Sequence, residues 1–318
     1  MGNSMEILAI RVSGMGGIVM LLPTLQKLKQ KYANSHITLL CDSTNSDIAY
    51  NSGGLIDSVV TINRKVFKEK RFFSILKEIR NVIRLRKRSF DVIIDFQNFG
   101  ETAFITHLCH AQEKRGAPKK KSTEYAYTTH IVRDQSGHRS QFFSRIAGVS
   151  DTLDFPQMVL SPVAEAYATR LMTKMNPDKK TIGMNIGSTQ ESRRWAENNF
   201  AAMATSLSPL YNVVVFAGER EKKYLSAFGN DVIRISDVSL DELCGAIGLC
   251  HYFISNDTGP VHIAAALGVP TLTFFSTGTD ENVGALTPYK VSLSNAENIN
   301  AITVEEAMEK LNTLISQK

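Results

Sequence analysis

The stretch YFISNDTGPVHIAAALGVPTLTFF, residues 252–275, decides the fold. It begins with an apolar run of strand length, continues through a short polar turn into a helical segment, and ends in a second apolar run at 271–275. Pro260 suits the first turn of a helix, and Gly268 followed by Pro270 is a typical helix end. A strand, a helix and a strand in this order predict a parallel sheet covered by helices.

The same alternation extends in both directions along the chain. In the first half we expect strands at Glu6–Val12, Ile37–Cys41, Ser58–Ile62 and Val92–Phe96, and a helix at Phe72–Leu85. In the second half we expect strands at Thr181–Ile186, Asn212–Phe216, Val232–Ile235, Tyr252–Ser255 and Thr271–Phe275, and a final helix at Val304–Ile315. The sequence therefore predicts the α/β class with two similar doubly wound halves.

A break in the pattern separates these halves. The chain has 318 residues, which suits two domains better than one. The segment DTLDFPQMVLSP, residues 151–162, contains two prolines and no sustained period, as expected of a linker. We therefore expect domains at 1–155 and 156–318, with the last helix packing back on the first. Ligands bind beyond the carboxyl ends of such strands, so two facing sheets would share one central cleft.

The polar turn before Pro260 has the composition of an anion site. Asn256, Asp257 and Thr258 are residues that cap helices, and Gly259 allows a ligand to approach the backbone closely. Unpaired N–H groups give a helix N-terminus a partial positive charge, which favours phosphate. A diphosphate is the ligand that we expect there.

The segment DTGPVHIAAALGVP, residues 257–270, closely matches the DSGxxHxAAALGxP signature of the heptosyltransferases, glycosyltransferase family 9. This resemblance implies the GT-B fold, two Rossmann-like domains that face a central cleft, and a nucleoside diphosphate sugar donor such as ADP-heptose. It also implies that Asp257, Thr258, Gly259 and His262 bind the donor. A well-capped core helix is the structural alternative.

Two further segments resemble the same family. NIGSTQESRRWAENNF, residues 185–200, is similar to a loop that leads to a Lys-x-Trp-Pro segment, with Arg193 at the lysine position. Arg193 and Arg194 would bind the phosphate oxygens of the departing diphosphate, or would be two solvated arginines on the surface. Residues 213–224, VVVFAGEREKKY, resemble the family segment in which a glutamate binds the ribose of the nucleoside. This resemblance implies that Glu221 is that glutamate, or Glu219 if the alignment shifts by two residues.

The first half departs from the family at one position. RVSGMGGIVMLLPTLQKLK, residues 11–29, resembles the family's opening segment, in which Gly-Asp supplies the presumed general base, but here the pair is Gly16-Gly17. Both glycines would border the substrate, yet Gly17 has no side chain to accept a proton. Asp95 and Glu101 are the candidates to replace the base, and a helix cap or a surface carboxylate is the alternative for each.

Other ligand classes have weaker patterns. Gly14-x-Gly16 after a strand resembles a dinucleotide-binding loop, but Val19 occupies its third glycine position. His107, Cys109 and His110 fall in a segment predicted as helical, but no carboxylate or further cysteine completes a metal site there. The chain also has no Asp-x-Asp motif. We therefore expect metal-independent chemistry without a cofactor.

Composition and charge bound the location and the partners. No stretch is apolar over the roughly 18 residues that a membrane span needs, and the start MGNSMEILAIR does not have the pattern of a signal peptide. The four cysteines show no CxxC spacing. We therefore expect a cytoplasmic protein. Residues 64–88 hold eleven Lys or Arg against two Glu. The basic helix at 71–88 and the run Lys119–Lys121 would meet anionic lipid headgroups on the inner face of the membrane, or would be a solvated face. No nucleic-acid reader motif accompanies the charge.

These patterns together predict an inverting glycosyltransferase. It would move a heptose or a similar sugar from an ADP-sugar or related donor to a hydroxyl of a saccharide or glycolipid acceptor, in lipopolysaccharide or surface-glycan synthesis. Because Gly17 cannot serve as a base, the alternative is a nucleotide-sugar-binding homologue with weak or no turnover. Sugar epimerisation on a similar two-lobed fold is a more distant alternative.

Overall fold

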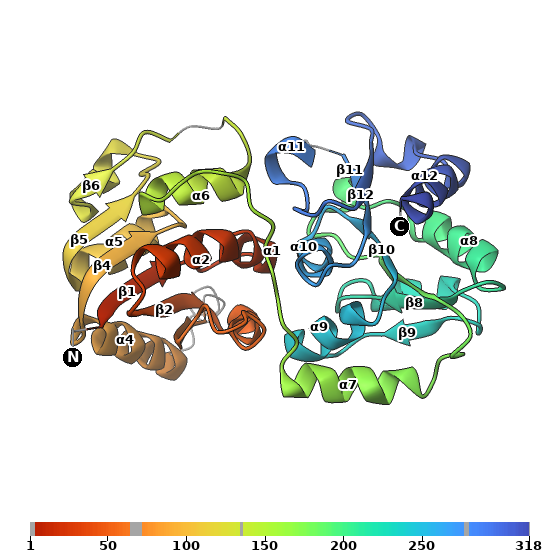
Figure 1. Ribbon diagram of the computed structural model, residues 1–318, viewed down its shortest axis with the longest axis horizontal. Coiled ribbons are helices and arrows are strands. Elements are labelled where there is room, and N and C mark those ends of the chain that lie inside the picture. The colour runs from red at the N-terminus through yellow and green to blue at the C-terminus, as the bar shows by residue number, and fades with distance from the viewer. Residues whose placement is uncertain (1–3, 64–71, 134–135, 277–279, 318) are drawn as a thin grey trace. The chain divides into compact units, whose positions relative to one another are not determined.

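The structure is a computed structural model that describes residues 4–63, 72–133, 136–276 and 280–317. Its contacts divide the chain into two compact units, Met1–Asp154 and Phe155–Lys318, each built on one parallel sheet of six strands (Figure 1). The predicted α/β class is confirmed. The first residue of the basic segment predicted at 71–88 lies outside the described residues.

The first sheet has the strand order β3-β2-β1-β4-β5-β6. Its strands are β1 Met5–Ile10, β2 Ser35–Asp42, β3 Ser58–Ile62, β4 Ser89–Asp95, β5 His110–Gly116 and β6 Thr129–His130. Its helices are α1 Met15–Val19, α2 Leu22–Lys31, α4 Phe72–Arg86, α5 Gly100–Leu108 and α6 Arg139–Ala147, with 3-10 turns at η1 Ser43–Ala49 and η2 Lys121–Ala126. Helices α2 and α6 pack side by side (Figure 1).

The second sheet has the strand order β12-β11-β10-β7-β8-β9. Its strands are β7 Thr181–Asn185, β8 Asn212–Phe216, β9 Ile233–Ile235, β10 Tyr252–Asn256, β11 Thr271–Phe275 and β12 Lys290–Ser294. Its helices are α7 Pro162–Met172, α8 Glu197–Leu207, α9 Leu240–Gly248, α10 Gly259–Ala266, α11 Asp280–Val283 and α12 Val304–Ser316, with 3-10 turns at η3 Glu191–Arg193, η4 Lys222–Ala227 and η5 Ile299–Ala301. Buried residues of α12 join the core of this unit.

Both sheets follow one topology. The first strand of each unit lies in the middle, the second and third extend to one side, and the fourth to sixth extend to the other. The order therefore reverses between β1 and β4 and between β7 and β10, where all strands are parallel. Ligands of doubly wound sheets bind at such switch points, beyond the carboxyl ends of the strands. The glycine loop follows β1, and the DTGPVH segment follows β10.

The predicted strands are confirmed with small shifts at their ends, but three strands were missed. β5, HAQEKRG, carries mostly polar side chains and has only one fully buried residue. β6 has two residues, and both are exposed. β12 is a half-buried edge strand. None of the three has the apolar run that identifies a buried strand, because each lies toward an edge of its sheet.

The helical assignment is confirmed for His107 but was wrong for Cys109 and His110. Helix α5 ends at Leu108, and His110 begins strand β5. The His107 ring instead packs against Tyr125, with 5.0 Å between ring centroids. Within the described residues, no three His, Cys, Asp or Glu side chains gather in a way that could hold a metal ion.

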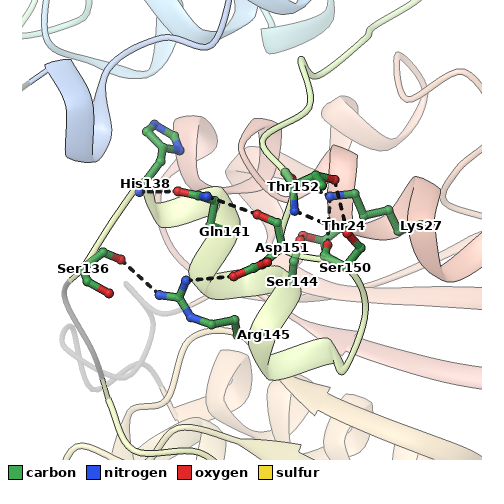
Figure 2. Close-up of polar contacts among 10 residues, drawn as sticks. All are labelled: Thr24, Lys27, Ser136, His138, Gln141, Ser144, Arg145, Ser150, Asp151 and Thr152. Carbon is green, nitrogen blue, oxygen red and sulfur yellow. Dashed lines mark hydrogen bonds and ion pairs between the residues drawn. The ribbon is translucent and has the colours of Figure 1, made fainter.

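The linker is anchored at both ends. On α2, the buried Lys27 Nζ donates to the carbonyl oxygens of Ser150 at 2.9 Å and Thr152 at 2.6 Å (Figure 2). It also pairs with Asp154 at 3.0 Å. Beyond this point, the Met158 N–H donates to the Ala266 carbonyl, at the end of α10, at 2.8 Å. Residues 155–157 therefore lie between the anchored stretches.

Across the described part of the chain, no helix is both long and apolar enough to cross a membrane.

Candidate active site

The start of α10 is held by side chains beneath it. Thr258 is the N-cap residue and has an extended backbone, but its side chain makes no capping bond to the helix. Its hydroxyl instead accepts from Asn185 Nδ2 at 2.9 Å, and the same Nδ2 donates to Ser255 Oγ at 3.0 Å. The Val261 N–H donates to the Thr258 carbonyl at 3.3 Å, and Pro260 has no N–H. The Gly259 N–H receives no cap from the Thr258 side chain, as an anion site at a helix start requires.

The four donor-binding candidates of this segment lie together. Asp257 and Thr258 follow β10 directly, Gly259 begins α10, and His262 lies on its first turn. The first three are half-buried, whereas His262 is buried. Pro260 occupies the first turn, where its missing N–H costs no helical hydrogen bond. Gly268 ends the helix in the left-handed region at a φ of 77°, as predicted for this glycine.

Asn256 connects this helix start to the loop after β7. Its side chain is fully buried, accepts from the Trp195 N–H at 2.9 Å and donates to the Gly187 carbonyl at 3.1 Å. Trp195 is also fully buried and donates its indole N–H to the Ile302 carbonyl at 2.8 Å. The loop that contains Arg193 is therefore fixed at both ends.

The two arginines of this loop have different surroundings. Arg193 ends η3 and is exposed. Arg194 is 9% exposed, and its guanidinium donates to Glu197 at 2.6 Å, to Glu191 at 3.1 Å and to the Tyr224 hydroxyl at 3.2 Å. These contacts outweigh the desolvation and raise the pKa of Arg194. Arg194 is thus occupied within the protein, whereas Arg193 extends into solvent.

A pocket of about 360 Å³ lies beside this loop. It is lined by Ser188, Thr189, Glu191, Arg194, Arg220, Glu221, Lys223 and Tyr224. Glu221 is 8% exposed as a residue, and its carboxylate has no hydrogen-bond or ion-pair partner among the described residues. Glu219 is exposed and pairs with Lys222 at 2.8 Å. Of the two alternatives, Glu221 therefore faces the pocket.

In the first unit, the glycine loop is packed against Arg11. Gly16 and Gly17 are buried in α1. A Cβ atom at Gly17 would lie 2.2 Å from Arg11 Nη2, so the guanidinium fills the space that a side chain would occupy there. Burial is the main cause that lowers the pKa of Arg11, to about 10. Arg11 remains a cation at neutral pH.

The two carboxylates predicted near this loop differ in exposure. Asp95 ends β4, is fully buried, and accepts from the N–H groups of Gln97 and Asn98, at 2.9 Å each, and from the Tyr127 hydroxyl at 2.8 Å. Desolvation by burial raises the pKa of Asp95 despite these bonds. Glu101 lies in the first turn of α5 and is exposed. Asp95 organises the loop after β4, whereas Glu101 can reach solvent.

Sequence reasoning missed the side chains that hold these loops. Asn185, Tyr127 and Arg11 received no role, because their partners lie 73, 32 and 86 residues away in sequence. Asn256 was considered only as a helix cap. One signal was available for Asn185 and Asn256, because each is a polar residue at the last position of a buried strand. A buried polar side chain needs hydrogen-bond partners, so both residues could have been expected to bond to neighbouring loops.

Comparisons with known proteins match most of the chain. Residues 79–312 match the model of glycosyltransferase family 9 (heptosyltransferase). Lipopolysaccharide heptosyltransferase 1 of Campylobacter coli is 25% identical over 295 residues, which cover 85% of this chain and 84% of the relative. Lipopolysaccharide heptosyltransferase 1 of Escherichia coli K12 is 21% identical, over 98% of this chain and all of the relative.

Solved structures share the fold over the whole chain. A family 9 glycosyltransferase from Veillonella parvula has a TM-score of 0.88 at 17% identity and covers 99% of this chain and 98% of that one. The E. coli heptosyltransferase WaaC with ADP has a TM-score of 0.81 at 17% identity, with coverage of 98% and 100%. The predicted GT-B class is confirmed. Because the family model spans most of the sequence, this chain belongs to glycosyltransferase family 9, the heptosyltransferase family.

Proposed function

We propose that this protein transfers heptose from ADP-heptose, with inversion at the sugar carbon, to a hydroxyl of a saccharide acceptor in lipopolysaccharide synthesis. The family assignment and the names of the relatives support this donor and this product class. The observation that carries the proposal is Glu221, a buried residue whose carboxylate lines a pocket of the second unit without a protein partner.

The donor site uses two features of the second unit. The N-terminus of α10 receives the diphosphate, because the Gly259 N–H has no side-chain cap from Thr258 and Gly259 allows close approach. Glu221 accepts hydrogen bonds from the ribose hydroxyls, because its carboxylate lines the pocket and has no protein donor of its own. Asp257 and His262 lie beside the same helix start and orient the sugar.

Departure of the diphosphate calls for a cation. Arg193 is the better placed of the two arginines, because the guanidinium of Arg194 already binds Glu191, Glu197 and Tyr224. An arginine binds phosphate oxygens through two parallel N–H donors and stabilises the charge that develops on them. Arg194 positions the pocket wall that carries Tyr224.

The proton of the acceptor hydroxyl goes to Glu101 in this proposal. The hydroxyl oxygen forms a bond to the sugar carbon, the bond from that carbon to the diphosphate breaks, and the proton passes to the carboxylate. Glu101 is exposed on α5, whereas Asp95 is buried and accepts three hydrogen bonds. General-base help is worth about 100- to 10,000-fold in rate. Loss of Glu101 would therefore slow transfer and leave donor binding unchanged.

A binding protein with little turnover is the second candidate, and Gly17 favours it. The space beside Gly17 is filled by the Arg11 guanidinium, so no carboxylate lies at this position of the loop. Calorimetric titration with ADP-heptose, together with UDP- and GDP-sugars, separates the candidates when turnover is followed in the same samples. Selective ADP-heptose binding with turnover supports the transferase, binding without turnover on any acceptor supports the second candidate, and no binding contradicts both.

We also propose a peripheral membrane contact through α4 on the cytoplasmic side. Around the half-exposed Ile83, the basic residues Arg80, Arg84, Arg86 and Lys87 are exposed. An apolar side chain among cations is typical of a helix that lies on anionic lipid. Sedimentation with phosphatidylglycerol vesicles tests this contact: we expect binding at low salt, loss on Arg84→Glu with Arg86→Glu, and no binding to phosphatidylcholine. Equal binding of the variant would contradict it.

A further inference from the structure

Tyr224 lies beside Glu221 in a pocket of the second unit. Both residues line this space of about 360 Å³, a volume within the range of small-molecule sites. Tyr224 is the third residue of the 3-10 turn η4, and Glu221 is its N-cap residue. Side chains three positions apart lie over one another in such a turn, so the phenol and the carboxylate are on the same side of it. The Tyr224 N–H donates to the Glu221 carbonyl at 2.9 Å, which fixes this spacing.

The Glu221 carboxylate is open to a ligand that carries a hydroxyl group. A Cβ atom would lie 3.7 Å from Glu221 Oε2 at Gly187 and 2.9 Å from it at Gly218, and neither glycine has a side chain to cover this oxygen. The carboxylate also has no hydrogen-bond or ion-pair partner among the described residues. A carboxylate only accepts hydrogen bonds, so it satisfies the O–H of a ligand hydroxyl but not its oxygen. A complete site for a hydroxyl therefore needs a donor as well.

Tyr224 supplies that donor, because its oxygen already accepts from Arg194. The Arg194 guanidinium donates to the Tyr224 hydroxyl oxygen at 3.2 Å and lies 4.2 Å from the centroid of the Tyr224 ring. Arginine has no acceptor, so the proton of the Tyr224 hydroxyl points elsewhere. Bonds to Glu191 at 3.1 Å and to Glu197 at 2.6 Å hold the guanidinium in this place. Arg194 is thus a positioning residue for the Tyr224 hydroxyl.

The Tyr224 proton is weakly held by the protein. Within the described part of the chain, the hydroxyl donates to Glu191 Oε1 alone, at 3.5 Å, beyond the roughly 2.5–3.0 Å of an ordinary O–H···O bond. The Glu191 side chain is 81% exposed, and the same oxygen already accepts from Arg194. An acceptor on a ligand in the pocket therefore competes readily for this proton.

We infer that Tyr224 binds a ribose hydroxyl of the donor together with Glu221. The ribose hydroxyl donates to the Glu221 carboxylate and accepts from the Tyr224 hydroxyl, so both of its hydrogen-bonding functions are used. This inference rests on the proposed donor site and adds the residue that distinguishes ribose from deoxyribose there. A site built to bind a hydroxyl rejects an analogue that lacks it, because the polar groups of the site are then left unpaired.

The test compares ADP with 2′-deoxy-ADP and 3′-deoxy-ADP by calorimetry on the full chain. We expect the wild-type protein to bind one of the two deoxy nucleotides about tenfold or more weakly than ADP, because that ligand leaves Glu221 and Tyr224 unpaired. Tyr224→Phe removes only the hydroxyl. It should weaken ADP binding about three- to tenfold and leave the affinity for that deoxy nucleotide unchanged. Tyr211→Phe is the matched control, because Tyr211 packs against the same hydrophobic core but lies outside the pocket lining.

A second measurement needs only the wild-type protein, labelled with carbon-13 at the tyrosine ring carbon Cζ. ADP should shift the Tyr224 resonance, and inorganic pyrophosphate, which has no ribose, should not. Equal shifts by both ligands would overturn the inference, as would equal weakening of ADP and both deoxy nucleotides by Tyr224→Phe. ADP binding that Tyr224→Phe leaves unchanged would overturn the inference alone. Failure of the wild-type protein to bind ADP would instead overturn the proposed donor site, and this inference with it.

Discussion

At the scale of single residues, the carboxylates of this protein divide by what surrounds them. Glu221 is buried without a partner and faces a pocket, whereas Asp95 is buried with its oxygens occupied. The sequence shows both as acidic residues near the end of a strand. Their difference depends on distant partners such as Tyr127, so it is visible only in the structure.

The role proposed for Glu221 predicts a specific loss of nucleotide affinity. Glu221→Gln replaces the carboxylate by an amide that accepts weaker hydrogen bonds from the ribose, so we expect ADP to bind about tenfold more weakly. Glu219→Gln is the matched control, because Glu219 is exposed and pairs with Lys222. Calorimetry with ADP measures both. An equal loss in the two variants, or no loss in either, would argue against Glu221 as the ribose contact.

The burial of Asp95 predicts a pH dependence of stability. Its pKa is raised above the ordinary value of 3.8 in the native state, so in the window just above 3.8 the native protein binds more protons than the unfolded chain. This group therefore makes the free energy of unfolding fall as pH rises through that window. Asp95→Asn removes this contribution and should flatten the dependence, as measured by urea unfolding at several pH values. An unchanged slope would show that Asp95 is not the source.

At the scale of elements, strands were predictable where they are buried and helices where their ends carry clear signals. Strand β10 and helix α10 followed from an apolar run, a proline in the first turn and Gly268 at the end. Strand β5 did not, because HAQEKRG lies near a sheet edge and is mostly polar. The linker was predicted from its prolines, but its anchoring by Lys27 depends on contacts more than 120 residues away in sequence.

The anchoring of the linker predicts a local change on mutation. Lys27→Met keeps the apolar stem but removes the donor to the Ser150 and Thr152 carbonyls (Figure 2). We expect hydrogen exchange over residues 150–154 to become about tenfold faster or more, because a bond from a charged donor is lost. Lys29→Met, which removes an ion pair with Asp57 elsewhere on α2, should leave this segment unchanged. Equal exchange in both variants would contradict the anchor.

At the scale of the whole molecule, the two units repeat one strand order and bring different motifs to their switch points. The periodicity of the sequence predicted the class and the doubly wound halves. The donor-binding role that the family resemblance gives to residues 257–270 stays a prediction. The topology then places the Gly16-Gly17 loop after β1 and the Thr258-Gly259 turn after β10. The sequence named Asp95 and Glu101 as candidates for the base that Gly17 lacks but could not separate them, because only the structure shows that Asp95 is buried and Glu101 exposed.

The central claim is that the diphosphate of the donor binds at the N-terminus of α10. The backbone amide resonance of Gly259, followed by NMR in protein labelled with nitrogen-15 glycine, tests it most directly. We predict that ADP shifts this resonance and that adenosine, which lacks the diphosphate, does not. A Gly259 resonance that ADP leaves in place while other resonances move would contradict the claim and place the nucleotide elsewhere.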